Sequence, residues 1–326
     1  MSESPEHGVP VTVVTGFLGA GKTTLVNRWL TKVTRGDIAV VVNEHGTVGI
    51  DGELLAARVE ALVEIAGGCV CCATQAELAR ALDQLASSPS PPKRILIETS
   101  GAASPAGVLH VLRGGIERGT TFLDGVVTVV DGARAESVLA EHELAIEQVG
   151  YADVVVLSRS DAGDAEARAR AASAVATHNG AALITTAARG ALDDASLATL
   201  DDLLAKRSMD FDPLGAASAP RPRADHAYES IALVHRGAVD GDRFAHFMEE
   251  EVARFAGRIF RTKGILAVDG IEERMIVQGV ADLVEVTFGE PWGSGARSSR
   301  FVIVGYGLDR DALARAFASC TITSPS

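Results

Sequence analysis

Several features that define other protein classes are scarce in this sequence. No run of about 18 or more apolar residues is present, so a transmembrane helix is not expected. The first ten residues lack the basic and apolar regions of a signal peptide. Basic residues are in the minority, with 30 lysines and arginines against 43 aspartates and glutamates, a formal net charge of −13. Such a chain is a poor match for nucleic acid or an anionic membrane, and we expect a cytoplasmic protein that binds neither.

Cysteine is also rare, and its placement is uneven. The chain has four cysteines, and Cys69, Cys71 and Cys72 lie so close together that they cannot form a structural disulfide framework. Reduced thiols are the better interpretation for a cytosolic protein. Cys320 stands alone in the expected C-terminal helix, where we interpret it as a core residue.

The 326 residues are enough for two domains. Up to about residue 186, runs rich in Val and Ile alternate with helical stretches, which predicts a doubly wound, mostly parallel α/β sheet. The expected strands are 11–15, 37–43, 61–66, 94–98, 125–131, 152–158 and 181–186, and the expected helices begin at 22 and 73 and span about 137–149, 165–177 and 194–206.

A segment rich in Pro, Ala and Asp, residues 210–225, lacks apolar periodicity and indicates an interdomain linker. We therefore expect a first domain over 1–206, a linker over 207–225 and a smaller α+β domain over 226–326. The expected strands of this second domain are 228–235, 258–268, 273–280, 282–288 and 300–307. Helices are expected over 242–255, capped by Asp240 or Gly241, and from Arg310, capped by Asp309.

The segment GFLGAGKTT, Gly16 to Thr24, fits the phosphate-binding pattern G-x-x-x-x-G-K-[ST] between a strand and a helix. The glycines let successive N–H groups face phosphate oxygens, while Lys22 reaches the β and γ phosphates and Thr23 holds Mg²⁺. The predicted P-loop residues are Gly16, Gly19, Ala20, Gly21, Lys22, Thr23 and Thr24.

Two further segments are placed to act on the γ-phosphate. Glu98 ends a buried strand three residues before Gly101, so its carboxylate can orient the attacking water or a magnesium-bound water; the alternative is an ordinary strand-end glutamate. Residues 43–51, NEHGTVGID, have the glycines and polar groups of a switch loop.

Base recognition is predicted at the end of strand 152–158. Many GTPases carry Asn-Lys-x-Asp there, and this chain has Ser158, Arg159, Ser160 and Asp161. Asp161 keeps the carboxylate that accepts from guanine, although it can also simply cap a turn. Ser158 lacks the amide that usually holds this loop, and Arg159 still offers an alkyl stem, so the guanine preference is expected to be weakened.

The thiol segment GGCVCC, residues 67–72, follows a strand and precedes a helix. A helix N-terminus lowers thiol pKa values and favours thiolates that bind a soft or borderline metal. Zn²⁺ takes four ligands in closed structural sites, so three sulfurs indicate an open site suited to transfer. Buried inert cysteines, a redox thiol and an iron–sulfur site are the alternatives. Possible fourth ligands are Glu44, His45, water or a partner residue; His226 is a further histidine at the domain entry, interpreted as structural.

Together, GFLGAGKTT, NEHGTVGID, GGCVCC, ETSGAASP and RTKGILAV resemble the CobW family of P-loop GTPases over nearly the whole chain. The resemblance implies a GTPase domain followed by the family's C-terminal domain, and a metallochaperone that inserts Zn²⁺ or Co²⁺ into client enzymes. It implies that Cys69, Cys71 and Cys72 bind the metal and that Glu98 belongs to the Walker B-like strand. Ser158 and Arg159 depart from the family's usual Asn and Lys, and the His-rich tract of many relatives is missing.

We therefore predict a GTP-hydrolysing metal chaperone that delivers Zn²⁺ or Co²⁺ to a client metalloprotein. Its cofactors are GTP, Mg²⁺ and the delivered metal, and a homodimer is a possible assembly. In this hypothesis GTP and Mg²⁺ order the 43–51 loop, the thiolates close around the metal, and hydrolysis loosens it. Two alternatives are a P-loop kinase or ligase with structural cysteines and a thiol redox sensor.

Overall fold

The computed structural model describes residues 8–30, 37–44, 62–66, 72–188, 191–192, 202, 204 and 228–322. The chain divides into two compact units, Met1–Ala174 with Leu183–Met209 and Val175–Ala182 with Asp210–Ser326. The segments 45–51, 67–71 and 207–225, and His226, lie outside the described residues. The expected domain boundaries therefore stay predictions.

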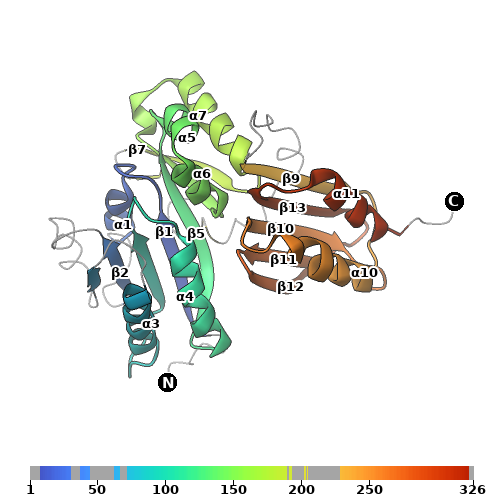
Figure 1. Cartoon of the computed structure of the whole chain (residues 1–326), viewed down its shortest axis with the longest axis horizontal. Coiled ribbons are helices and arrows are strands. Elements are labelled where there is room, and N and C mark those ends of the chain that lie inside the picture. The colour runs from blue at the N-terminus through green and yellow to red at the C-terminus, as the bar shows by residue number, and fades with distance from the viewer. Residues whose placement is uncertain are drawn as a thin grey trace. The chain divides into compact units, whose positions relative to one another are not determined.

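The first unit is built on an eight-stranded sheet in the order β3-β2-β4-β1-β5-β6-β7-β8 (Figure 1). Its neighbours pair in parallel except for β7 and β8, which are antiparallel. The strands are β1 Val9–Thr15, β2 Ile38–Glu44, β3 Leu62–Ala66, β4 Arg94–Thr99, β5 Thr121–Asp131, β6 Val154–Ser158, β7 Leu183–Ala188 and β8 Ala191–Leu192.

Helices flank this sheet because the central strands are apolar on both faces. Leu25, Val26 and Trp29 of α1 pack with alternate strand residues in one buried cluster. Val13 and Ile97 point the other way and are fully buried as well; α3 and α4 lie side by side (Figure 1). The helices are α1 Lys22–Leu30, α3 Cys72–Ala86, α4 Ala106–Glu117, α5 Ala135–Glu141, α6 Glu143–Gly150 and α7 Ala165–His178, with a short 3₁₀ turn, η1, at Ser160–Ala162.

Two helical features differ from the sequence prediction. The helix α4 was not predicted, because the pair Gly114 and Gly115 weakens its helical pattern. A Cβ at Gly115 would lie 2.2 Å from Thr121 Oγ1, so glycine is needed where α4 packs closely on β5. The single helix expected over 137–149 is in fact α5 and α6, separated at His142, whose backbone is extended.

The second unit contains a five-stranded antiparallel sheet in the order β12-β11-β10-β13-β9. Asp240 and Asp309 cap their helices through Arg243 N and Ala312 N, as predicted. The elements are β9 Tyr228–His235, α10 Gly241–His246, a π-helical segment η3 Phe247–Val252, a 3₁₀ turn η4 Ala253–Phe255, β10 Ile259–Ala267, β11 Glu273–Val280, β12 Leu283–Pro291, β13 Ser299–Tyr306 and α11 Arg310–Ser319. The predicted fold class, a mostly parallel α/β domain followed by a smaller α+β domain, is confirmed.

The regular helix expected over 242–255 changes to wider turns after His246. Phe244 and Phe247 lie on either side of this change, and both rings contact Phe301 and Phe317 with centroids 5.4–6.5 Å apart. Four aromatic rings therefore meet in one core beneath the helices.

Cys320 belongs to this core, as predicted. It is 1% exposed and its Sγ lies 3.4 Å from the carbonyl oxygens of Arg243 and Ala316. Burial raises the pKa of the Cys320 thiol, so the thiol stays protonated and is a poor metal ligand at neutral pH.

His178, at the end of α7, is expected to make the fold less stable in mild acid. Burial lowers the pKa of its imidazole more than a backbone hydrogen bond involving Tyr228 raises it. Because the fold favours the neutral ring, stability is lost as pH falls below the unfolded value of about 6.5. Urea unfolding between pH 7.5 and 5.5 should show a steeper loss in the wild type than in a His178→Gln variant. Identical slopes in the two proteins would contradict this prediction.

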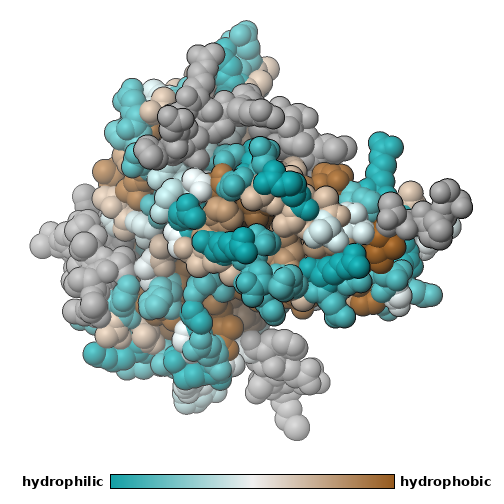
Figure 2. Space-filling model, turned by 45° about the vertical axis from the view of Figure 1, so that its right-hand side comes forward, coloured by the Kyte–Doolittle hydropathy of each residue, from teal (hydrophilic) through white to brown (hydrophobic). Residues whose placement is uncertain are grey.

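The surface in Figure 2 is mostly hydrophilic, with hydrophobic residues in scattered areas. Within the part of the chain that the structure describes, no helix is both long and apolar enough to cross a membrane.

Candidate functional site

The loop between β1 and α1 has the backbone shape of a phosphate-binding loop. Gly16, Gly19 and Gly21 adopt φ angles of 139°, 73° and 100°, which side chains disfavour. A Cβ on Gly16 would lie 2.1 Å from the carbonyl oxygen of Val129, so no larger residue fits there. The loop then enters α1 at Lys22, whose first turn has N–H groups without helical partners. These groups and the helix dipole favour an anion.

The side chains around this loop combine a cation with oxygen ligands. Lys22 Nζ donates to the carbonyl oxygens of Gly16 and Phe17 at 2.9 and 3.5 Å. Thr23 Oγ1 donates to Glu98 Oε1 at 2.7 Å, and Glu98 is only 5% exposed at the end of β4. A hydroxyl and a carboxylate so close together match the oxygen ligands that Mg²⁺ prefers.

A pocket of about 390 Å³ opens above these residues, a size that is usual for a small-molecule site. It brings together five of the predicted P-loop residues, Gly19, Gly21, Lys22, Thr23 and Thr24, with the predicted Glu98. The end of β4 and the segment after it close one side; the lining residues there are Thr99, Ser100, Gly101 and Ala102.

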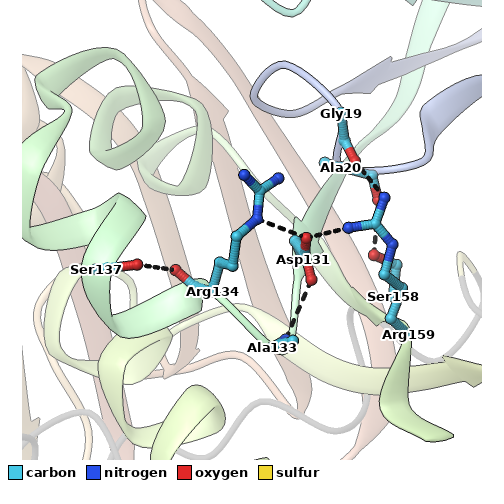
Figure 3. Close-up of polar contacts among 8 residues, drawn as sticks. All are labelled: Gly19, Ala20, Asp131, Ala133, Arg134, Ser137, Ser158 and Arg159. Atoms are coloured by element: carbon cyan, nitrogen blue, oxygen red, sulfur yellow. Dashed lines mark hydrogen bonds and ion pairs between the residues drawn. The ribbon is translucent and has the colours of Figure 1, made fainter. Parts of the chain in front are cut away.

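Sequence reasoning missed Asp131, which organises the opposite side of the P-loop. It ends β5 and is 4% exposed, yet its carboxylate accepts hydrogen bonds from the guanidinium groups of Arg134 and Arg159 and from Ala133 N (Figure 3). Arg159 also donates to the carbonyl oxygen of Gly19 at 3.0 Å. One sequence signal could have pointed to Asp131. It is an acidic residue at the end of an apolar strand, and that strand pairs with the P-loop strand β1.

The loop after β6 is attached to the P-loop although Ser158 lacks the usual amide, and the weakened guanine preference stays a prediction. Ser158 Oγ donates to the carbonyl oxygen of Ala20 at 2.6 Å, so a hydroxyl connects this loop to the P-loop (Figure 3). Arg159 adds its own bonds and has a left-handed backbone with φ of 54°. Together they replace the missing amide with two direct contacts to consecutive P-loop carbonyls.

A second pocket of about 320 Å³ lies next to the first and shares Gly21, Thr24 and Arg159 with it. Its other lining residues are Ala20, Leu25, Val129, Val156, Ser158 and Ala187. Two predicted P-loop residues, Gly16 and Ala20, do not line the first pocket. Of these, Ala20 lines the second, less polar pocket. Asp161 lies nearby in sequence, exposed in the 3₁₀ turn η1.

The thiol segment is largely outside the described residues. Cys72 is the first residue of α3, while Cys69 and Cys71 precede the described part of that helix. Where the structure does place side chains, no group of three or more His, Cys, Asp or Glu residues could hold a metal ion. His45 and His226 are also outside the described residues, and Glu44 is described only as part of β2.

The backbone nevertheless fixes where the thiol segment starts. β3 and β2 end together, with Glu44 paired to Ala66, and β2 pairs with β4 through Asn43 and Thr99. β4 in turn pairs with β1, where Val14 lies opposite Glu98. Four features therefore lie at the carboxyl ends of these strands: the P-loop, Glu98, the start of the 43–51 segment and the start of the thiol segment.

Comparison with known families agrees with this arrangement. Residues 10–185 match the CobW/HypB/UreG nucleotide-binding domain, and residues 228–321 match the cobalamin synthesis protein CobW C-terminal domain. The chain is a GTPase of the CobW family. The family resemblance predicted from the sequence is confirmed.

Relatives of this CobW-family chain match over nearly its whole length. The zinc chaperone YjiA of Escherichia coli is 30% identical over 95% of this chain and 98% of its own. The zinc chaperone CobW of Pseudomonas aeruginosa is 34% identical over 94% of this chain and 90% of its own. A crystal structure of Zn(II)-bound YjiA GTPase from E. coli shares the fold, with a TM-score of 0.70 and 24% identity over 97% of this chain and 99% of that one.

Proposed function

We propose that this CobW-family GTPase carries Zn²⁺ or Co²⁺ on Cys69, Cys71 and Cys72 and delivers it to a client metalloprotein, with GTP hydrolysis controlling release. The observation that carries the proposal is the position of the strand ends. β3 ends, and the thiol segment begins, on the same side of the sheet as the phosphate pocket. The zinc chaperones among the relatives support the cargo.

The phosphate groups of GTP would bind in the pocket above Gly19, Gly21 and Lys22. The Lys22 ammonium supplies the charge for the β and γ phosphates, and the first turn of α1 supplies N–H donors. Gly16 shapes the start of the loop, and Thr24 lines both pockets.

Mg²⁺ fits the same pocket, with Thr23 as its protein ligand and Glu98 behind it. The 2.7 Å hydrogen bond from Thr23 Oγ1 to Glu98 Oε1 supports this placement, because it brings a hydroxyl and a carboxylate together beside the P-loop. Bound there, Mg²⁺ would neutralise part of the phosphate charge. The Glu98 carboxylate, buried at the end of β4, accepts a hydrogen bond from the attacking water and orients it toward the γ-phosphorus.

The base would lie beside Arg159, which borders both pockets. The alkyl stem of Arg159 can cover the ring, and Asp161 can accept from the guanine N1 and N2 hydrogens. Since Ser158 and Arg159 hold their loop to the P-loop, the site keeps a fixed position for Asp161 despite the altered motif.

The end of β3, where the thiol segment begins, lies on the same sheet as the P-loop strand. The order β3-β2-β4-β1 separates the start of the thiol segment from the P-loop by three strand spacings, or about 14 Å. Three thiolates leave a coordination position open, which suits handing the metal to another protein. The client, a homodimeric state and the cytoplasmic location stay predictions.

Metal content should test the cargo assignment directly. Protein purified under reducing conditions with added zinc is expected to hold about one Zn²⁺ per chain. A Cys69→Ser, Cys71→Ser, Cys72→Ser variant should hold almost none while keeping GTP turnover. Elemental analysis and nucleotide analysis of the same sample would measure both.

Cys320→Ala is the matched control, because it removes a thiol from the core of the other unit and should leave the zinc content unchanged. Equal zinc in the wild type and the triple variant would show that the three thiols are not the site. A wild type that takes up no zinc would exclude zinc as the cargo.

A further inference from the structure

Gln148, on α6, makes contacts that phosphate binding alone does not explain. Its side chain is completely buried, and Nε2 donates to the carbonyl oxygens of Gly101 and Ala103 at 3.4 and 3.0 Å. Both acceptors are carbonyls, which fixes the amide nitrogen on this side. One fully buried side chain therefore holds two residues of the segment that follows β4.

The neighbouring residue on α6 holds the same segment at a third point. Ser104 Oγ donates to Glu147 Oε1 at 2.6 Å, and it also accepts from Ala106 N at 3.1 Å at the start of α4. The 101–104 segment is thus attached to α6 along its length. It is not a loop positioned only by its own turns.

The attached segment reaches the phosphate pocket at Gly101. A Cβ on Gly101 would lie 2.9 Å from Leu18 N and Cα and 2.9 Å from Lys22 Nζ. Gly101 is therefore enclosed between the P-loop on one side and the Gln148 amide on the other. A shift of a few tenths of an ångström would change the fit of Gly101 to any ligand held by Lys22.

We propose that Gln148 is a positioning residue that sets the affinity of this site for nucleoside triphosphate over nucleoside diphosphate. The inference rests on the proposed function, in which Lys22 binds the β and γ phosphates, and on the place of Gly101 beside Lys22 in the same pocket. A diphosphate has no γ-phosphate to meet Gly101, so its binding does not depend on the position of the 101–104 segment. Release of the 101–104 segment from α6 therefore lowers the affinity for the triphosphate more than the affinity for the diphosphate.

The amide is suited to this role by its chemistry. Its single nitrogen carries two hydrogens and no charge, so it satisfies two carbonyl oxygens without placing an ion in the core. Methionine has the same length and no donor, so Gln148→Met removes both hydrogen bonds with little change of volume.

Calorimetric titration of the full chain with a non-hydrolysable GTP analogue and with GDP would test the proposal. In Gln148→Met, the analogue affinity is expected to fall about tenfold, while GDP affinity changes by less than about twofold. The kcat for GTP should fall as well, since Gly101 is mispositioned during turnover and not only during binding.

Thr128→Val is the matched control. Thr128 Oγ1 donates to the backbone carbonyl oxygen of Gln148 at 2.7 Å, so its loss loosens the same turn of α6 without removing a contact to the 101–104 segment. A purely structural role would make both variants lower the two affinities equally. That result, or an unchanged affinity ratio in Gln148→Met, would overturn the inference and leave the GTPase proposal intact.

Glu147→Ala provides a second variant at a partly exposed position, where truncation does not open the core. It removes the Ser104 contact and should lower the affinity ratio in the same direction by a smaller factor. If Gln148→Met does not fold, an unchanged ratio in Glu147→Ala overturns the inference. If the wild type binds neither nucleotide, the proposed function itself fails.

Discussion

Replacing Lys22 with alanine is expected to lower GTP turnover by about 100- to 1000-fold, the size of effect that follows removal of one preorganised electrostatic donor from an active site. Lys22 lies at the junction of the P-loop and α1, and its Nζ bonds to the carbonyl oxygens of Gly16 and Phe17. Without the ammonium group, the negative charge that grows on the β–γ bridge during cleavage loses the side-chain cation that stabilises it. Steady-state phosphate release would measure the loss.

Arg28→Ala is the control for charge, because Arg28 is exposed in the last turn of the same helix. It removes one positive charge from α1 and should leave turnover within about twofold. Trp29 is 4% exposed in α1, so its fluorescence reports whether either variant disturbs the helix. A Lys22→Ala protein with normal Trp29 emission and normal turnover would contradict the assignment.

Zinc affinity is expected to differ by about 10⁴ between the GTP-analogue state and the GDP state if the switch runs from fully loaded to fully released. The arrangement of strands gives a physical route for such coupling. β2 lies between β4, which carries Glu98, and β3, which leads into the thiol segment. Only one strand therefore separates the end of β4 from the strand that leads into the thiol segment, which is the route that we propose for the coupling.

The measurement is a competitive zinc titration with GTP analogue, with GDP and without nucleotide, under reducing conditions. The tightest binding is expected with the analogue. In Lys22→Ala the zinc affinities measured with GTP analogue, with GDP and without nucleotide should become equal. The three thiols are still present, but nucleotide no longer changes how tightly they bind zinc. Equal zinc affinities in all three states of the wild type would disprove the coupling and leave zinc binding and hydrolysis as separate properties.

Local sequence patterns predicted the parts of the fold that local backbone preferences determine. The glycine spacing from Gly16 to Gly21 requires unusual φ angles that few other residues adopt, and the structure has them. The helix caps at Asp240 and Asp309 were equally predictable, because a carboxylate at the first position satisfies a free N–H group. The five strands of the second sheet followed from their apolar runs.

Features that depend on contacts distant in sequence were not predictable. The break between α5 and α6 at His142 has no Pro or Gly; the imidazole stacks on Phe17 of the P-loop with centroids 4.5 Å apart. Asp131 acquires its role only because β5 lies between β1 and β6, which brings its carboxylate close to the arginine that follows β6. In both cases the deciding contact joins residues that are far apart in the sequence.

Arg159 has a consequence for how these loops assemble. Its left-handed backbone costs on the order of 1 kcal/mol, and its bonds to Gly19 and Asp131 offset that cost only when β1 and β5 are already in place. The loop after β6 should therefore not adopt this shape in a fragment that lacks the P-loop. Phosphate and base recognition would then be acquired together, in one cooperative step of folding.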